Sequence, residues 1–259
     1  MSRHRFFLEA ALPGVHGRVA LPLSESDVHH AVAVLRIRVG EEIDVVEPAG
    51  RVWRVRIEDA SAMALVATVA ELIPEGAPGS NPHVTLVFGV SKRGKNDIVV
   101  EGATEVGISA FLPVLTARSI VKLDIEKSRE RGERWRRVAL AAAKQSKRAT
   151  VPEVHDPASF AAVVPLLADY DMVLVAWEEA TPQGRGVKAA IASAALEPGA
   201  RVALVVGPEG GLTADEVAAL DGIGGVVVTL GETLLRTETA AVVAGALVLH
   251  ELGGLGNSA

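Results

Sequence analysis

From position 83 onward, apolar residues occur in short continuous runs that alternate with longer amphipathic stretches. A continuous apolar run has no polar face, so each run is expected to form a strand that is covered on both sides, as in a parallel sheet. Strands and helices in alternation predict an α/β fold. The predicted strands are 84–90, 110–115, 171–177, 201–207 and 225–230, and the predicted helices are 97–106, 128–147, 158–168, 187–194, 214–220 and 237–252.

The first 74 residues have a different pattern, in which short runs rich in Val and Ile are separated by turn residues. One helix is expected over "DVHHAVAVLRI", capped by Ser24 or Ser26. The stretch "IPEGAPGSNP" follows, and its prolines and glycines can continue neither a helix nor a strand. The sequence therefore predicts a small β-rich domain over 1–74, a linker over 75–82 and an α/β domain over 83–259. The strands expected in the first domain are 5–8, 18–21, 42–47, 51–58 and 65–72.

Composition narrows the class of protein. Hydrophobic residues make up 49% of the 259 residues and charged residues 22%, which is typical of a globular protein. Neither a membrane-spanning run nor a signal peptide is recognisable, so we expect a cytoplasmic protein that does not bind membranes. The chain has no cysteine, and its only neighbouring histidines, His29 and His30, would diverge on a helix. We therefore expect no metal site.

Positive charge is concentrated in one part of the chain. Residues 83–150 contain 14 Lys and Arg against 7 Asp and Glu, although the whole chain has a net charge of −6. Such a local excess is typical of surfaces that bind phosphates, and it points to a nucleic-acid partner. A solvated helix with a basic bias would give the same pattern.

Two glycine-marked loops near the C-terminus are the strongest candidates for a ligand site. "GPEGG", Gly207 to Gly211, directly follows a predicted strand, and ligands of open parallel sheets bind beyond the carboxyl ends of strands. Thr213 and Glu216 form a capping-box pattern that begins the next helix. The loop is neither a dinucleotide fingerprint nor a Walker loop, and Glu209 would repel a phosphate. An ordinary strand-to-helix turn remains the alternative.

The second loop, "LGETLLRTETAA" at 230–241, runs from a predicted strand into a very apolar helix. That helix must be buried, either in the core or against another subunit. Arg236 and Glu238 lie at its start, where charged groups need partners. An ion pair of Arg236 with Glu238 or with Glu209 would be a purely structural explanation.

Together the two loops resemble the signature loops of the RsmE-type ribosomal RNA methyltransferases of the SPOUT superfamily. The similarity extends to "RFF", "HHAVAVLRIRVGEEI", "ATEVGISAFLPVLTARSIVK" and "RWRRVALAAAKQSKRATVPEV", in the same order along the chain. The resemblance implies a PUA-like β-barrel that holds RNA, followed by a SPOUT α/β domain with a C-terminal trefoil knot. It also implies a homodimer in which the apolar C-terminal helix contributes to the interface.

The resemblance further implies S-adenosylmethionine as the cofactor and N3 of a uridine in 16S ribosomal RNA of the small subunit as the methyl acceptor. It places the cofactor in the two loops, at Gly207, Glu209, Gly210, Gly211, Leu230, Gly231, Leu234, Leu235 and Thr239. The catalytic pair would be Arg236 and Glu238, with the identity of the base left open. RNA contacts are expected at Arg36, Arg38, Lys92, Arg93, Lys95, Arg118, Lys144, Gln145 and Arg148. The chain departs from the family pattern at Lys144, usually Glu, and at Gly102, usually Lys.

Two other classes of function fit parts of the sequence. A non-catalytic RNA-binding protein of the same fold would share the basic region, but intact loops with Arg236 and Glu238 argue against it. A nucleotide-dependent α/β enzyme would use "GPEGG" to hold phosphate, but it lacks the expected Lys. Cofactor binding distinguishes all three classes.

Overall fold

The structure is a computed structural model, and it describes residues 3–14, 16–74, 82–92, 94–119, 124–180 and 184–256. It divides into two compact units. Unit 1 comprises Met1–Ala77 and Ala143–Thr150, and unit 2 comprises Pro78–Ala142 and Val151–Ala259. Of the expected linker, 75–82, only Pro82 lies within the described residues.

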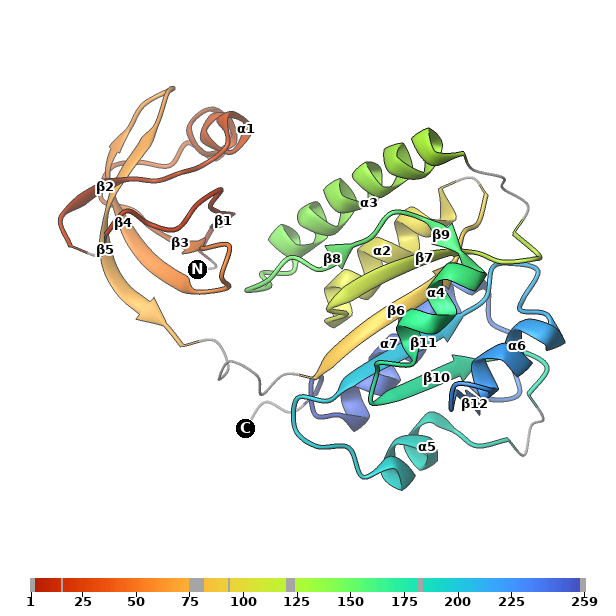
Figure 1. The fold of residues 1–259 in the computed structure, drawn as a ribbon. Coiled ribbons are helices and arrows are strands. Elements are labelled where there is room, and N and C mark those ends of the chain that lie inside the picture. The colour runs from red at the N-terminus through yellow and green to blue at the C-terminus, as the bar shows by residue number, and fades with distance from the viewer. Residues whose placement is uncertain are drawn as a thin grey trace. The chain divides into compact units, whose positions relative to one another are not determined.

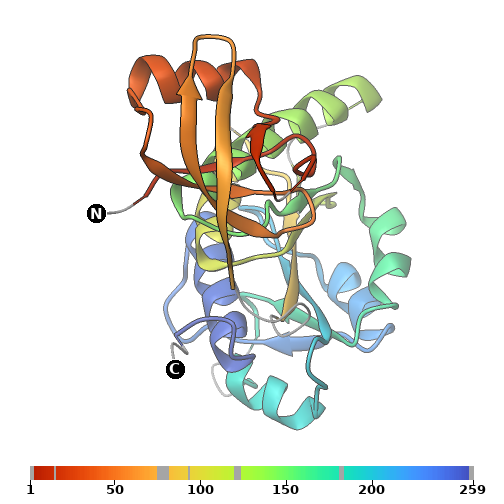
Figure 2. The same ribbon diagram turned by 90° about the vertical axis from the view of Figure 1, so that its left-hand side faces the viewer.

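Unit 1 is built on a five-stranded mixed sheet with the order β1-β3-β4-β5-β2. β1 pairs with β3 in parallel, and the other neighbouring strands are antiparallel. The long hairpin of β4 and β5 is drawn in orange in Figure 2. Val45, Val55 and Ile57 are fully buried in the core of this unit. The strands are β1 Arg5–Phe7, β2 Arg18–Ala20, β3 Glu42–Val46, β4 Val52–Ala60 and β5 Leu65–Ile73.

The helix of unit 1 is shorter than the sequence predicted. α1 spans Glu25–His29 and continues as a single π-helical turn over His30–Val34. The side chain of Ser24 caps it by accepting a hydrogen bond from the backbone N–H of Asp27. The predicted extension to Ile37 is wrong, because Arg36 adopts a left-handed backbone conformation with φ of 55°. A residue with positive φ cannot continue a right-handed helix.

Unit 2 is an α/β domain with a parallel sheet, as predicted. The strand order is β12-β10-β11-β6-β7-β8, and β9 pairs with β7. Every pair in the sheet is parallel. The five predicted strands are present, while β8 and β9 were not predicted because two residues are too short to show a pattern. The strands are β6 His83–Gly89, β7 Ala110–Leu115, β8 Glu153–Val154, β9 Ala158–Ser159, β10 Met172–Ala176, β11 Arg201–Val206 and β12 Val226–Val228.

Helices cover both faces of this sheet (Figure 1). All six predicted helices of this domain are present, with ends that differ by a few residues. They are α2 Lys95–Val106, α3 Ile125–Gln145, α4 Phe160–Leu167, α5 Val187–Ala194, α6 Ala214–Asp221 and α7 Thr237–Glu251. Side chains on one face of β6, among them Leu86 and Phe88, pack with α2, α3, α5 and α7. Val87, on the opposite face, packs with α4 and α6. This burial on both faces explains the continuous apolar runs of the strands.

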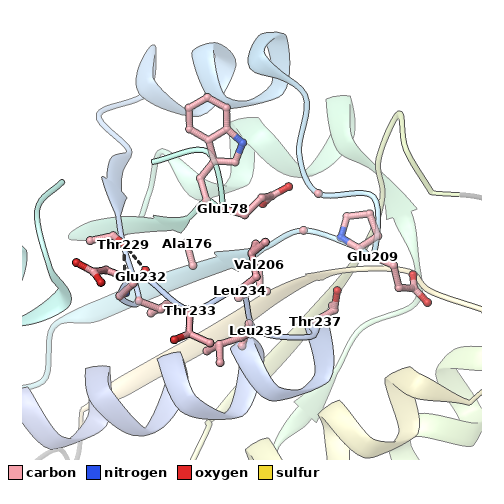
Figure 3. Close-up of a pocket in the computed structure, with 17 residues that line it drawn as sticks. Ala176, Glu178, Val206, Glu209, Thr229, Glu232, Thr233, Leu234, Leu235 and Thr237 are labelled. Atoms are coloured by element: carbon pink, nitrogen blue, oxygen red, sulfur yellow. Dashed lines mark hydrogen bonds between the residues drawn. The ribbon is translucent and has the colours of Figure 1, made fainter. Parts of the chain in front are cut away.

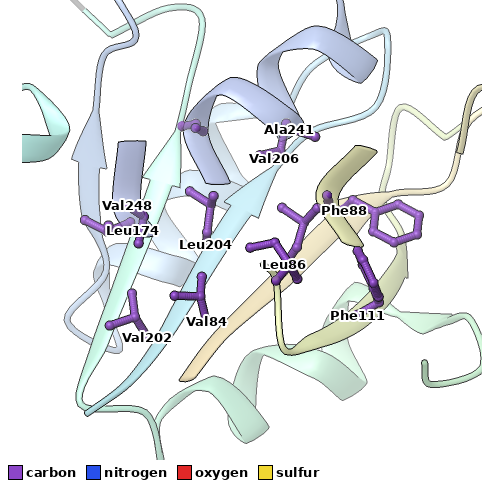
Figure 4. Close-up of a cluster of buried hydrophobic side chains, with 14 of the residues drawn as sticks. Val84, Leu86, Phe88, Phe111, Leu174, Val202, Leu204, Val206, Ala241 and Val248 are labelled. Atoms are coloured by element: carbon purple, nitrogen blue, oxygen red, sulfur yellow. The ribbon is translucent and has the colours of Figure 1, made fainter. Parts of the chain in front are cut away.

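The apolar C-terminal helix, α7, is a core helix with one exposed side. Ala241 and Val248 belong to the buried cluster shown in Figure 4. α7 also packs closely against α2, because a Cβ atom at Gly102 would come within 2.9 Å of Val242. A larger residue at position 102 would push the two helices apart.

Candidate functional site

A pocket of about 180 Å³ lies at the carboxyl edge of the parallel sheet, at the ends of β10, β11 and β12 (Figure 3). Both glycine-marked loops contribute to it, together with the first turn of α7. The sequence placed a site at this edge because parallel strands end there together. The lining residues are Ala176, Trp177, Glu178, Val206, Gly207, Pro208, Glu209, Gly211, Thr229, Leu230, Gly231, Glu232, Thr233, Leu234, Leu235, Thr237 and Ala240.

The loop after β11 requires glycine at Gly211. This residue has φ of 70°, and a Cβ atom on it would lie 1.5 Å from Oε1 of Glu178. The backbone N–H of Gly211 donates to the carbonyl of Pro208 at 2.8 Å, which closes the turn. The loop ends at the predicted capping box, in which Thr213 and Glu216 bond reciprocally at the start of α6. The loop is thus held at both ends and keeps its backbone open to the pocket.

The loop after β12 forms the opposite wall. The hydroxyl of Thr229 accepts a hydrogen bond from the N–H of Gly231 at 3.2 Å, and Gly231 has φ of 114°. Leu234, with 81% of its surface exposed, and the half-buried Leu235 follow. Of the nine residues that the resemblance assigns to the cofactor, seven line the pocket. Gly210 and Thr239 lie outside the lining.

Three acidic residues belong to the lining of the pocket, Glu178, Glu209 and Glu232 (Figure 3). Among the described lining residues none is Lys or Arg. Glu178 and Glu232 were missed at the sequence level, although Glu178 directly follows a predicted strand that neighbours β11. An acidic lining disfavours phosphate and favours a ligand that carries positive charge.

Glu209 is held in its ionised form. Burial by itself would raise its pKa, but hydrogen bonds from Ser91 and from its own backbone, with the charge of Lys95, bring the pKa below its ordinary value. Nζ of Lys95 lies 3.4 Å from Oε1 of Glu209. The pocket therefore keeps this negative charge at neutral pH.

Lys95, and not Arg236, is the cation that faces Glu238. Lys95 is the first residue of α2, and its Nζ lies 3.9 Å from Oε2 of Glu238. Arg236 is the exposed N-cap residue of α7, and in the part of the chain that the structure describes it forms no ion pair with Glu238 or Glu209. The alternative that Arg236 makes a structural ion pair with either glutamate is therefore wrong.

Arg118, expected to contact RNA, lies against the first loop instead of standing free. Its Nη1 donates to the carbonyls of Gly210 at 3.0 Å and Leu212 at 3.3 Å, and it lies 3.8 Å from Oε1 of Glu179. The buried carboxylate of Glu216 accepts from the backbone N–H of Ala117 at 2.8 Å. Hydrogen bonds of Arg118, Ala117 and Glu216 thus connect the segment after β7 with the loop after β11 and the start of α6.

The other expected RNA-contact residues have varied surroundings. Lys92 is exposed in unit 2, and Arg36, Arg38 and Gln145 are exposed in unit 1. Lys144 pairs with Asp27 of the same unit at 2.6 Å. Burial lowers the pKa of Arg148 to about 10, so its guanidinium still carries its charge at neutral pH. Arg93 lies outside the described residues.

Among the described residues, no group of three or more His, Asp or Glu side chains is arranged to hold a metal ion. None of the described helices has the length and apolar character needed to cross a membrane.

The fold and the pocket together define a protein of the α/β class with a ligand site at the carboxyl edge of a parallel sheet, preceded by a small mixed-sheet domain. Residues 79–249 match the RNA methyltransferase domain, and residues 23–69 match the RNA methyltransferase PUA domain. The chain therefore belongs to the RNA methyltransferase family. The predicted family, the SPOUT-type α/β sheet and the PUA-like first domain are confirmed.

Several relatives carry one name. The ribosomal RNA small subunit methyltransferase E of Bacillus subtilis is 34% identical over 240 residues, which is 93% of each chain. Its namesake from Mycobacterium bovis is 39% identical over 219 residues, 83% of this chain and 80% of the relative. The crystal structure of the Neisseria gonorrhoeae namesake bound to S-adenosyl methionine superposes with a TM-score of 0.77 at 26% identity, covering 95% of this chain and 96% of that one.

Proposed function

We propose that this protein transfers a methyl group from S-adenosylmethionine to N3 of a uridine in 16S ribosomal RNA of the small ribosomal subunit. One observation carries the proposal: the two glycine-marked loops meet around a pocket whose lining includes three glutamates and, among the described residues, neither Lys nor Arg. The shared name of the relatives and the ligand of the Neisseria gonorrhoeae structure support it. The N3 position comes from the resemblance to RsmE-type enzymes.

The pocket fits this cofactor by charge and by backbone shape. When bound, S-adenosylmethionine supplies a methyl group that its cationic sulfonium makes electrophilic. Acidic residues in the lining favour that positive charge. A pocket lined by Lys and Arg would instead favour the phosphate of a nucleotide. Gly207 and Gly211 leave the loop backbone free of side chains. We assign to cofactor binding the seven lining residues of the prediction, Gly207, Glu209, Gly211, Leu230, Gly231, Leu234 and Leu235, with Gly210 and Thr239 as supports of the same loops.

We assign proton removal to the Arg236 and Glu238 region. Methylation of N3 requires loss of the imide proton, and a carboxylate within reach is a suitable acceptor. Glu238 lies in the first turn of α7, next to Thr237 of the pocket lining. Arg236 is exposed at the same helix end, where its planar donors suit a phosphate of the RNA.

RNA binding is proposed for the predicted polar and basic side chains of both units. Phosphate contacts fix the position of the RNA but not the choice of base. The candidates are Arg36, Arg38, Lys92, Lys95, Arg118, Gln145 and Arg148, with Lys144 also available if its pairing with Asp27 opens. Because Arg118 already donates to two loop carbonyls, an RNA contact there would also affect the cofactor loop.

A homodimer and the trefoil knot stay predictions from the resemblance. The dimer is supported by apolar side chains exposed on adjacent helices, Val243 and Leu247 on α7 and Ile98 on α2. Because ribosomal RNA is the proposed substrate, we expect the protein in the cytoplasm.

The test is methylation of small ribosomal subunits that lack the modification. Purified protein and S-adenosylmethionine are added, and the digested 16S RNA is searched for N3-methyluridine by mass spectrometry. Its appearance is expected. Cofactor binding without N3-methyluridine would contradict the proposed acceptor, and absence of cofactor binding would favour a non-catalytic RNA-binding protein.

A further inference from the structure

Two long helices begin side by side next to the pocket. α2 starts at Lys95 and α7 at Thr237, and the two helices pack against each other. Lys95 Nζ lies between two carboxylates, 3.4 Å from Oε1 of Glu209 and 3.9 Å from Oε2 of Glu238. Because Glu209 lines the pocket, this cluster of Lys95, Glu209 and Glu238 lies at the boundary of the cofactor site.

One atom of the cluster lacks a hydrogen bond. Oε2 of Glu238 is buried from solvent and has no hydrogen-bond partner among the described residues. At 3.9 Å, Lys95 is too far away to donate to it. A buried carboxylate oxygen without a donor is unfavourable, so a donor is expected to come from a bound molecule.

The backbone at Lys95 is held in place by hydrogen bonds, whereas the Lys95 side chain is partly exposed to solvent. The buried Asn96 accepts from the N–H of Ser91 at 2.7 Å and donates to the carbonyl of Gly89 at 3.2 Å. These bonds anchor the start of α2 to the end of β6. The side chain of Lys95 keeps 38% of its surface exposed. It can therefore turn its ammonium from the glutamates to a ligand without any movement of the helix.

We propose that Lys95 is a catalytic residue that donates to a carbonyl oxygen of the target uracil ring while Glu238 accepts the N3 proton. The inference rests on the proposed function. In the step, the N3–H bond breaks and the proton passes to the Glu238 carboxylate. N3 forms a bond to the methyl carbon, the carbon–sulfur bond breaks, and its electron pair stays on sulfur as a neutral thioether. Negative charge that develops on the ring oxygen is balanced by the ammonium of Lys95.

Besides Lys95, the ends of two helices can stabilise negative charge at this place. The N-terminal ends of helices carry partial positive charge, and two of them, α2 and α7, meet beside Lys95. Arg236, the exposed N-cap residue of α7, forms no ion pair with either glutamate of the cluster in the described part of the chain. Lys95 is thus both a cation and a neighbour of the proton acceptor.

The experiment compares Lys95→Met with wild type in steady-state methylation of unmodified small subunits. Loss of one preorganised donor to a developing oxyanion lowers kcat by about 10²- to 10³-fold. We expect a fall of that order, with the dissociation constant of S-adenosylmethionine by calorimetry unchanged. Lys95→Arg, which keeps the charge, is expected to retain clearly more activity than Lys95→Met.

Lys92→Met provides the comparison, because it removes an exposed lysine of the same segment that, among the described residues, forms no ion pair with either glutamate of the cluster. It is expected to raise KM for the subunit and not to lower kcat in the same way. If Lys95→Met changed only KM, as Lys92→Met does, Lys95 would be a phosphate contact and the proposal would be overturned. Loss of cofactor affinity in parallel with kcat would make Lys95 a structural brace and overturn it too.

Two further readouts keep the test decisive. Thermal unfolding of each variant shows whether the fold is kept, and Lys95→Gln replaces Lys95→Met if the latter unfolds. If wild type forms no N3-methyluridine, the proposed function itself fails. If wild type is active and Lys95→Met keeps its kcat, only the role of Lys95 fails.

Discussion

At the scale of single residues, the carboxylate of Glu238 has the environment of a proton acceptor. It is largely buried at a helix start, and one of its oxygens lacks a hydrogen-bond donor in the described part of the chain. A substrate N–H can supply that donor. The amide of Gln has nearly the same shape but cannot accept a proton at neutral pH.

We therefore expect Glu238→Gln to lower kcat at neutral pH by about 10²- to 10⁴-fold, the usual contribution of general base catalysis. Activity should recover partly as the pH is raised, because the imide then loses its proton to solvent. The measurement is the pH profile of kcat for wild type and variant. A variant whose profile is parallel to that of wild type at every pH would remove Glu238 from the proton transfer.

Gly211 is the second position where a single atom decides the site. Its φ of 70° makes any side chain costly, by about 1 kcal/mol or more, and a Cβ would displace the carboxylate of Glu178. Since Glu178 lines the pocket, displacement of its carboxylate should weaken the binding of a cationic ligand. Loss of one charge-assisted contact corresponds to about tenfold or more in affinity.

Gly211→Ala is accordingly expected to raise the dissociation constant of S-adenosylmethionine by about tenfold or more. The matched control is Gly224→Ala, at φ of 86° with no atom within 4 Å of the added Cβ and outside the pocket. It carries the same backbone penalty. Calorimetry on both variants separates the two effects, and equal affinities would show that Glu178 does not help to hold the cofactor.

At the scale of elements, Glu216 connects three segments. Its buried carboxylate accepts from Thr213 within the capping box of α6 and from Ala117 after β7. The sequence predicted the capping box because its residues are three positions apart. The bond to Ala117 could not be predicted in that way, because it depends on how β7 and β11 are placed in the sheet.

Glu216→Ala should lower the free energy of unfolding by about 1.5–3 kcal/mol, because it leaves two part-buried backbone N–H groups, those of Thr213 and Ala117, without their charged acceptor. Asp215→Ala removes an exposed carboxylate from the same helical turn and should cost about 0.3–1 kcal/mol through the helix dipole alone. Urea unfolding gives both values. A Glu216 variant no less stable than the Asp215 variant would contradict the bracing role.

At the scale of the whole molecule, the proposed dimer depends on the outer side of α7. Val243 and Leu247 are separated by one helical turn and are 37% and 40% exposed, while residues on the other side of the helix are buried in the core. Exposed apolar side chains on neighbouring helices are typical of an interface. A charge there would have to be buried without a partner.

Leu247→Asp is expected to convert a dimer into monomers in sedimentation velocity and to reduce methylation. Leu166→Asp is its control, since Leu166 is 55% exposed on α4, in the layer on the opposite face of the sheet. Wild type that sediments as a monomer at assay concentration would exclude the dimer. A dimer preserved by Leu247→Asp would place the interface elsewhere.

The sequence by itself determined the local features of this protein. Continuous apolar runs specify strands that are buried on both faces, and helical spacing and capping residues specify where helices lie. Gly207, Gly211 and the Thr213–Glu216 pair identified the loop of the pocket, because turn geometry and capping depend on neighbouring residues. Where a local rule has an exception, such as the positive φ of Arg36, the predicted helix ran too far.

The tertiary structure alone decided which distant side chains meet. Lys95 faces Glu238, Glu178 covers Gly211, and Arg118 donates to Gly210. Each pair joins segments that are far apart in the chain and that come together only because the parallel strands end at one edge. A long charged side chain has several partners compatible with its sequence position, so packing, and not local pattern, selects the one it contacts.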